Sequence, residues 1–164
     1  MNNIIIADTG PLIALALIDQ LPILSELFEN IYITEAVLHE ATADTSRAGA
    51  KNILTALKDK VIVKYEIDTN CDFLYELLKI LDKGEAESLF LAKKLDGIAL
   101  IDEKRGRKVG KKNHIKITGT AAILVKAKQA GKIPLVKPLL NKLTTSGYRL
   151  SDRLIDEILK LCDE

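Results

Sequence analysis

The stretch Ile4-Ile5-Ile6-Ala7-Asp8-Thr9-Gly10-Pro11 decides the fold class of this 164-residue chain. Its first four residues are all apolar, the run ends at Asp8, and Gly10-Pro11 opens a helical stretch that continues to Ile18. A short, continuously apolar run is typical of a strand that is buried on both faces of a parallel sheet. We therefore expect a buried strand that runs into a helix, with Asp8 at the junction.

Short apolar runs of the same kind recur along the chain, with helical patterns between them. They occupy residues 31–33, 61–63, 98–101 and 115–117. This alternation predicts a three-layer α/β fold with a mostly parallel central sheet. We expect residues 1–164 to form a single domain, of which about 134–164 form a C-terminal helical extension. Its predicted helices span 135–144 and 151–161, with Ser151 as the N-cap of the second.

The composition places the chain among folded, water-soluble proteins. Hydrophobic residues make up 48% and charged residues 29%, which excludes disordered and fibrous classes. The longest apolar stretch, Pro11 to Ile18, is far too short to span a bilayer, and the N-terminus carries no basic segment of a secretion signal. We therefore expect a cytoplasmic protein with no membrane association.

Cysteine and histidine provide no recognisable site. Cys71 and Cys162 stand alone, without a CxxC pair or a histidine at ligand spacing. This excludes a zinc site and a disulfide framework of the secreted kind. His39 and His114 have no partner in a catalytic setting, so we expect both to be exposed.

Two acids follow predicted strands. Asp8 comes after residues 4–7 and Asp102 after residues 98–101. Ligands of open parallel sheets bind beyond the carboxyl ends of the strands, which is where both side chains should lie. An Asx turn or a helix N-cap would explain either residue alone equally well. Two acids at equivalent strand ends favour a functional site.

A third acid, Glu40, lies in a predicted helix over residues 35–45. At 100° per residue, Val37, Leu38 and Ala41 form the apolar stripe of this helix, and Glu40 borders it. The Glu40 side chain is therefore predicted to face inward at the rim of the core.

A fourth acid lies in the predicted helix over residues 84–95. Glu85 shares a face with Leu89 and Ala92, which predicts that it points inward, whereas Glu87 falls on the side of Lys94 and is predicted to face solvent. A first-turn acid that complements the helix dipole is the alternative explanation of Glu85.

Four carboxylates brought together need a neutralising partner. Two of them about 4 Å apart repel by about 4 kcal/mol at an effective dielectric constant near 20. Mg²⁺ and Mn²⁺ prefer oxygen ligands, keep several waters and bridge to phosphate. Such ions orient a scissile phosphate and lower the pKa of the attacking water, so phosphodiester hydrolysis needs neither histidine nor cysteine.

A basic run follows Asp102. Residues 104–116 contain seven Lys or Arg and no acid, although the net charge of the whole chain is only +1. A solvated helix face is the usual explanation of such a run. Its position beside the proposed metal site also predicts phosphate binding, whereas 4% aromatic residues with no Trp argue against base-stacking platforms. The residues predicted to bind RNA are Lys104, Arg105, Arg107 and Lys108.

These motifs resemble a known family. The stretch Ile5-Ile6-Ala7-Asp8-Thr9-Gly10-Pro11-Leu12-Ile13 resembles the start of PIN domains, in which an Asp ends the first strand and Thr or Ser follows. Further likenesses cover nearly the whole chain, which looks like a prokaryotic branch of the family that is related to the VapC toxins. They lie at Val37-Leu38-His39-Glu40, Gly84-Glu85-Ala86-Glu87 and Leu100-Ile101-Asp102-Glu103, and at residues 105–107, 118–120 and 151–159.

The resemblance implies a metal-dependent ribonuclease that uses Mg²⁺ or Mn²⁺. By position, Asp8, Glu40, Glu85 and Asp102 would be both the catalytic and the metal-binding residues. Thr9 would support the site with its hydroxyl. PIN domains most often have Asp where this chain has Glu85. Either Asp102 or the supporting Glu103 would supply the last carboxylate, and strand alternation together with the family spacing favours Asp102.

Other functions fit the sequence less well. A haloacid-dehalogenase-type phosphatase needs a second Asp where this chain has Gly10, and a receiver domain needs an acidic pair where it has Asn2-Asn3. The alternative of a different class is a PIN-like domain without activity that serves as a binding or assembly module. The resemblance also suggests a homodimer, and a toxin of this kind would pair with a small antitoxin protein.

Overall fold

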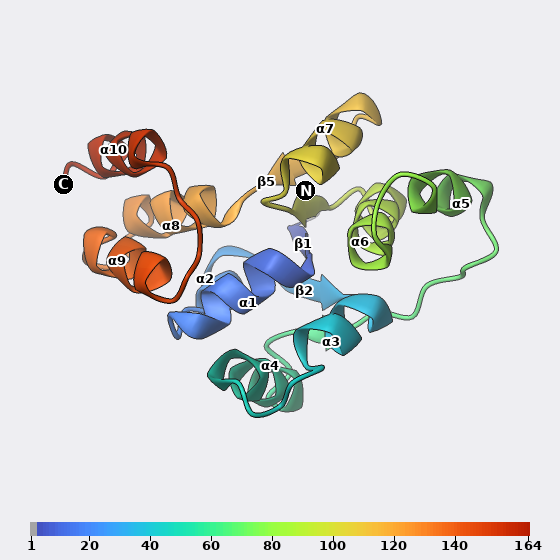
Figure 1. Cartoon of the computed structure of the whole chain (residues 1–164), viewed down its shortest axis with the longest axis horizontal. Helices are drawn as coiled ribbons and strands as arrows, with labels where there is room; N and C mark the ends of the chain where they lie inside the picture. The colour runs from blue at the N-terminus through green and yellow to red at the C-terminus, as the bar shows by residue number, and fades with distance from the viewer. Residues whose placement is uncertain (1–2) are drawn as a thin grey trace.

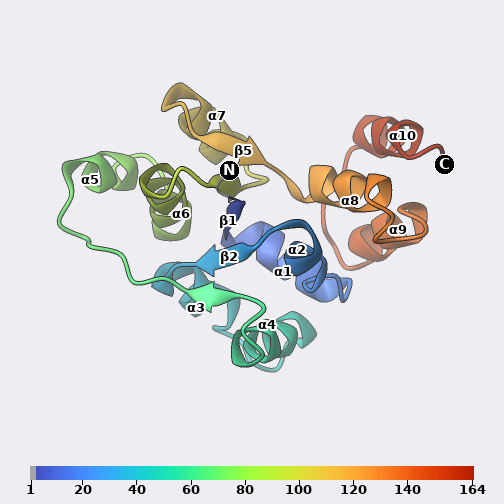
Figure 2. The same ribbon diagram turned by 180° about the vertical axis from the view of Figure 1, so that it is seen from behind.

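The computed structural model describes residues 3–164, so Met1 and Asn2 of the predicted domain lie outside the described residues. Within this range one sheet contains five parallel strands in the order β3-β2-β1-β4-β5, and Figure 2 shows β2 and β3 running side by side. The strands are β1 (Ile4–Ala7), β2 (Asn30–Ile33), β3 (Val63–Lys64), β4 (Ile98–Leu100) and β5 (Lys116–Thr118).

Helices cover both faces of the sheet, which confirms the predicted three-layer fold. Figure 1 shows α5, α6 and α7 at one end of the molecule and α8, α9 and α10 at the end that carries the C-terminus. The helices are α1 (Thr9–Leu17), α2 (Ile23–Leu27), α3 (Glu35–Ala41), α4 (Ala48–Lys58), α5 (Asp72–Leu78), α6 (Lys83–Lys94), α7 (Lys104–Lys112), α8 (Thr120–Gln129), α9 (Lys137–Thr145) and α10 (Asp152–Leu161).

The alternation of side chains along β1 explains why this strand is apolar throughout. Ile5 and Ala7 join one hydrophobic core, which also contains residues of α1, α4 and α8, while Ile6 joins a second core with α5 and α6. Successive side chains of a strand point to opposite faces, and both faces of this sheet are covered. A polar residue within β1 would therefore be buried on either face.

Two predicted strands lie elsewhere than expected. The apolar run 61–63 contributes only Val63 to β3, because the N–H groups of Val61 and Ile62 bond to the Ala56 carbonyl in the turn after α4. Strand β5 begins one residue later than predicted, because the Ile115 N–H bonds to Gly110 at the end of α7. Apolar residues that pack into a turn resemble a strand in sequence, and this explains both shifts.

The two C-terminal helices agree with the prediction to within about two residues, the usual uncertainty of helix ends. The Ser151 side chain accepts a hydrogen bond from the Leu154 N–H at 3.2 Å, which confirms the predicted N-cap. Leu140, Leu143 and Ile158 are buried in the first core. The extension therefore packs on the α/β layers.

The histidines and cysteines are placed as expected. His39 and His114 are exposed, and both cysteines are free thiols. No helix within residues 3–164 is long and apolar enough to cross a membrane.

The strand order fixes where a ligand would bind. The chain fills the sheet from β1 to β3 on one side and then crosses to β4 and β5 on the other, so the order reverses between β1 and β4. Open α/β sheets bind ligands at such a switch point, beyond the carboxyl ends of the strands. Asp8 lies directly at this position, and its N–H donates to the Leu100 carbonyl at 3.1 Å.

Candidate active site

Asp8 is a buried acid at the switch point. Its side chain is 6% exposed, and among the described residues Oδ1 has no hydrogen-bond partner. The pKa of the carboxyl is raised from 3.8 to about 7, mainly by burial and to a smaller extent by the nearby acids Asp82, Glu40 and Asp102, while the Thr9 backbone N–H opposes the shift. A buried carboxylate with an unpaired oxygen is costly unless a cation or a proton neutralises it.

Glu85 has the same character. It is 5% exposed on the first turn of α6, and its Oε1 also lacks a hydrogen-bond partner within residues 3–164. Its pKa is raised to about 7, mainly by burial and next by repulsion from Asp82 and Asp8. A Cβ on Gly106 of α7 would lie 2.7 Å from Oε1, so any other residue there would force this carboxylate to shift. The inward orientation predicted for Glu85 is confirmed.

Glu40 is exposed at the end of α3, yet its carboxylate lies against the other elements of the site. The Thr9 hydroxyl donates to Glu40 Oε2 at 2.7 Å. A Cβ on Gly84 would lie 2.8 Å from the same oxygen, so Gly84 leaves the room that the carboxylate occupies. Thr9 and Gly84 therefore hold the Glu40 carboxylate at the edge of the site, but the residue is exposed and does not face inward as predicted.

Asp82 also belongs to the cluster, although it was not among the acids predicted from the sequence. Asp82 is the N-cap of α6, and its side chain accepts a hydrogen bond from the Glu85 N–H at 2.9 Å. Among the neighbouring charges, Asp82 raises the pKa of both Asp8 and Glu85 the most. The signal was present in the sequence, because Asp82-Lys83-Gly84-Glu85 has the spacing of a capping box.

Asp102 differs from the other acids because its oxygens are well occupied. Oδ1 accepts from the Thr120 N–H at 2.8 Å, and Oδ2 accepts from the Thr120 hydroxyl at 2.6 Å and from the Tyr148 hydroxyl. Glu103, the alternative last carboxylate, is exposed and caps α7 without a side-chain hydrogen bond. The structure therefore fixes Asp102 and leaves Glu103 in solvent.

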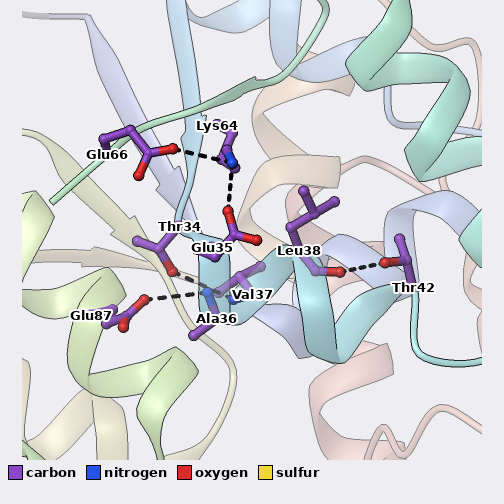
Figure 3. Close-up of polar contacts among 9 residues, drawn as sticks. All are labelled: Thr34, Glu35, Ala36, Val37, Leu38, Thr42, Lys64, Glu66 and Glu87. Carbon is purple, nitrogen blue, oxygen red and sulfur yellow. Dashed lines mark hydrogen bonds and ion pairs between the residues drawn. The ribbon is translucent and has the colours of Figure 1, made fainter.

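The prediction that Glu87 faces solvent is wrong. Glu87 is 3% exposed, and its Oε2 accepts a hydrogen bond from the Ala36 N–H at 3.3 Å (Figure 3). The Ala36 N–H belongs to the first turn of α3, where N–H groups have no partner within the helix. Glu87 thus joins α6 to the helix that carries Glu40, and Lys83 lies 3.9 Å from its other oxygen.

The basic run forms α7, beside the acids. Gly106 and Gly110 face α6 and β5, so the basic side chains project from the rest of the helix. Lys104, Arg105 and Lys108 are exposed, and the Arg105 charge lowers the pKa of Glu85. Arg107 is half-buried and donates to the Ile101 carbonyl at 2.8 Å, so part of its guanidinium is engaged within the fold.

The acids surround Asp8 without forming a closed set of ligands. Among residues 3–164, no three Asp, Glu, His or Cys side chains are grouped closely enough to surround one metal ion. Proteins nevertheless usually bind Mg²⁺ through only one or two carboxylates, and the ion keeps several of its waters. The unpaired oxygens of Asp8 and Glu85 are hard donors of the kind that this ion requires, so these two residues fit it.

An open parallel α/β sheet with buried carboxylates at its switch point has its candidate ligand site beyond the carboxyl ends of the strands. The sequence matches the family DUF3368, described as PIN domain, over residues 4–164, and the chain belongs to this family. PIN domains have a nuclease-type fold, are generally hydrolases of nucleic acids and typically use divalent metals. No curated protein and no solved structure matched the chain.

Proposed function

We propose that the chain is a ribonuclease that depends on Mg²⁺ or Mn²⁺ and hydrolyses RNA phosphodiester bonds. The observation that carries the proposal is the pair Asp8 and Glu85, two buried carboxylates that each have one oxygen without a hydrogen-bond partner in the described chain. Their raised pKa values reflect the cost of holding two negative charges out of water. A divalent cation removes that cost.

Asp8 and Glu85 would hold the ion, and Glu40, Asp82 and Asp102 would add negative charge around it. When bound, the ion supplies a Lewis acid that orients the scissile phosphate and lowers the pKa of the attacking water. The Thr9 hydroxyl keeps the Glu40 carboxylate at the rim. Burial of Asp8 limits the access of water to this side of the site.

The exposed basic side chains of α7 would hold the RNA backbone. Lys104, Arg105 and Lys108 lie on the helix that packs on Glu85 through Gly106, so phosphates bound there would be close to the acids. Phosphate contacts provide affinity without sequence preference. Arg107 would contribute less, because it already donates to a backbone carbonyl.

Cleavage of single-stranded RNA by the purified protein, with Mn²⁺, Mg²⁺ or EDTA, tests the proposal. We expect cleavage with either ion, none in EDTA, and at least about a hundredfold loss in Asp8→Asn, because the charge at the centre of the site is removed. Asp156→Asn is the matched control, since Asp156 is an exposed aspartate of α10 outside the site, and it should cleave like the wild type.

Wild-type protein that binds neither ion and cleaves no RNA would favour the alternative, an inactive PIN-like module for binding or assembly. A role as the toxin of a toxin–antitoxin pair, a small antitoxin partner, a homodimer and a cytoplasmic location remain predictions that follow from the resemblance and the composition.

A further inference from the structure

A residue of the C-terminal extension reaches the proposed active site. The Tyr148 hydroxyl donates a hydrogen bond to Asp102 Oδ2, across 46 residues of sequence. Tyr148 is only partly exposed, and its hydroxyl is the donor in this contact because an ionised carboxylate can only accept.

The backbone fixes Tyr148 at this position. Gly147, which follows the C-cap residue of α9, has φ of 87°. The Tyr148 N–H bonds to the Leu143 carbonyl at 3.0 Å, and the Gly147 N–H bonds to the Thr144 carbonyl at 3.0 Å. These two bonds form a Schellman motif, which requires a left-handed residue and turns the chain sharply. Glycine adopts that conformation without strain.

The helices on both sides of Tyr148 are tied to the rest of the fold. In α9, Lys142 pairs with Asp19 of the α1 end at 2.5 Å. At the end of the chain, after α10, the Glu164 carboxylate lies 3.3 Å from Lys128 Nζ of α8 and accepts from the Val136 N–H at 2.7 Å, at the start of α9. The segment that carries Tyr148 is therefore held from both directions.

Asp102 receives three donors from two residues, namely the Thr120 N–H, the Thr120 hydroxyl and the Tyr148 hydroxyl. An ionised carboxylate has about four acceptor positions, so this group keeps about one of them free and cannot rotate without breaking hydrogen bonds. Asp8 and Glu85 instead have oxygens without partners in the described residues. Of these three acids, Asp8 and Glu85 are available to an ion, whereas Asp102 is rigidly held.

We propose that Tyr148 is a positioning residue of the active site, which fixes the Asp102 carboxylate beside the bound ion and makes the C-terminal extension part of the catalytic unit. The inference rests on the proposed metal-dependent cleavage. Outer partners of this kind orient carboxylates at metal sites, and their loss typically costs about ten- to a hundredfold in metal affinity or activity.

The test is a calorimetric titration of Mn²⁺ into wild-type protein and Tyr148→Phe, combined with kcat and KM for RNA cleavage. Phe keeps the ring and removes only the hydroxyl. We expect Mn²⁺ affinity and kcat to fall by about tenfold or more, with KM nearly unchanged because the RNA contacts lie on α7. Tyr75→Phe, at an exposed site on α5, is the matched control and should behave like the wild type.

A second variant approaches the same contact from the backbone. Gly147→Ala keeps the Tyr148 hydroxyl but strains the positive φ that places it, so it should lower Mn²⁺ affinity in the same direction. Urea unfolding in EDTA establishes that each variant is folded. If the wild type binds no Mn²⁺, the proposed function fails. If the wild type binds but Tyr148→Phe binds and cleaves equally well or better, only the role of Tyr148 is overturned.

Discussion

Replacing Asp8 by Asn should stabilise the metal-free protein, and the gain should depend on pH. The folded state raises the pKa of Asp8 from 3.8 to about 7, mainly through burial, which corresponds to about 4 kcal/mol of differential stability. Asn has nearly the same shape and no charge, so it removes the penalty of ionising this group. The value of about 4 kcal/mol is an upper limit for a single substitution.

The stability difference between wild type and Asp8→Asn depends on pH because the folded state binds the Asp8 proton more tightly than the unfolded state. Below about pH 3.8 the Asp8 carboxyl is neutral in both the folded and the unfolded state, so burying it carries no charge penalty. The wild type and Asp8→Asn should then have similar free energies of unfolding. Between pH 3.8 and about 7 the unfolded chain ionises more readily than the folded one, so the wild type loses stability. Above about pH 7 the difference between the proteins should be constant.

Urea unfolding in EDTA at a series of pH values measures this directly. We expect Asp8→Asn and wild type to have similar free energies of unfolding near about pH 4, and the variant to be more stable by up to about 4 kcal/mol near pH 8. The exposed Asp156→Asn variant controls for the general effect of removing an acid. A stability difference that is the same at both ends of the pH range would refute the argument from burial.

Three further predictions follow from the neighbours of the acids. Gly84→Ala must displace the Glu40 carboxylate, which lies 2.8 Å from the new Cβ, so kcat for RNA cleavage should fall by about ten- to a hundredfold although thermal unfolding shows no loss of stability. Glu87→Ala should cost about 1–3 kcal/mol in urea unfolding, because a buried N–H of α3 loses its partner, whereas Glu87→Gln keeps an acceptor and should cost less. Arg105→Ala should weaken the binding of unrelated RNAs and lower the salt slope by about 1, and an unchanged slope in filter binding would show that α7 does not contact phosphate.

The sequence was sufficient to predict the structural environment of residues that belong to a clear local pattern. The apolar run before Asp8 and the alternation of strands and helices led to the parallel sheet, because a strand buried on both faces must be apolar throughout. Glu85 is buried, in agreement with the prediction from the helical period.

The same helical period failed for Glu87. A helical period distinguishes inward from outward residues only in a helix that has one buried face and one solvent face. Every residue of α6 from Gly84 to Ala92 is buried, because α3, α5, α7 and β1 surround this part of the helix. A helix that is enclosed on all sides has no solvent face to predict, and the sequence of α6 alone does not reveal its neighbours.

The partners of Asp102 could not be predicted for a different reason. Thr120 and Tyr148 lie 18 and 46 residues after Asp102 in the sequence. Their hydrogen bonds to Asp102 therefore form only when β4, α8 and the extension have packed together. Periodicity describes one element at a time, whereas these hydrogen bonds depend on how separate elements meet. Asp82 was closer to being predictable, because its capping-box spacing to Glu85 is visible in the sequence.

We propose that Asp8 and Glu85 hold a divalent ion at the switch point between β1 and β4. Anomalous scattering from crystals of the protein grown with Mn²⁺ locates such an ion directly. We predict an anomalous peak within bonding distance of Asp8 Oδ1 and Glu85 Oε1, and its absence from crystals of Asp8→Asn grown in the same way. A fully occupied Mn²⁺ elsewhere on the molecule, or no peak near these two oxygens in the wild type, would contradict the claim.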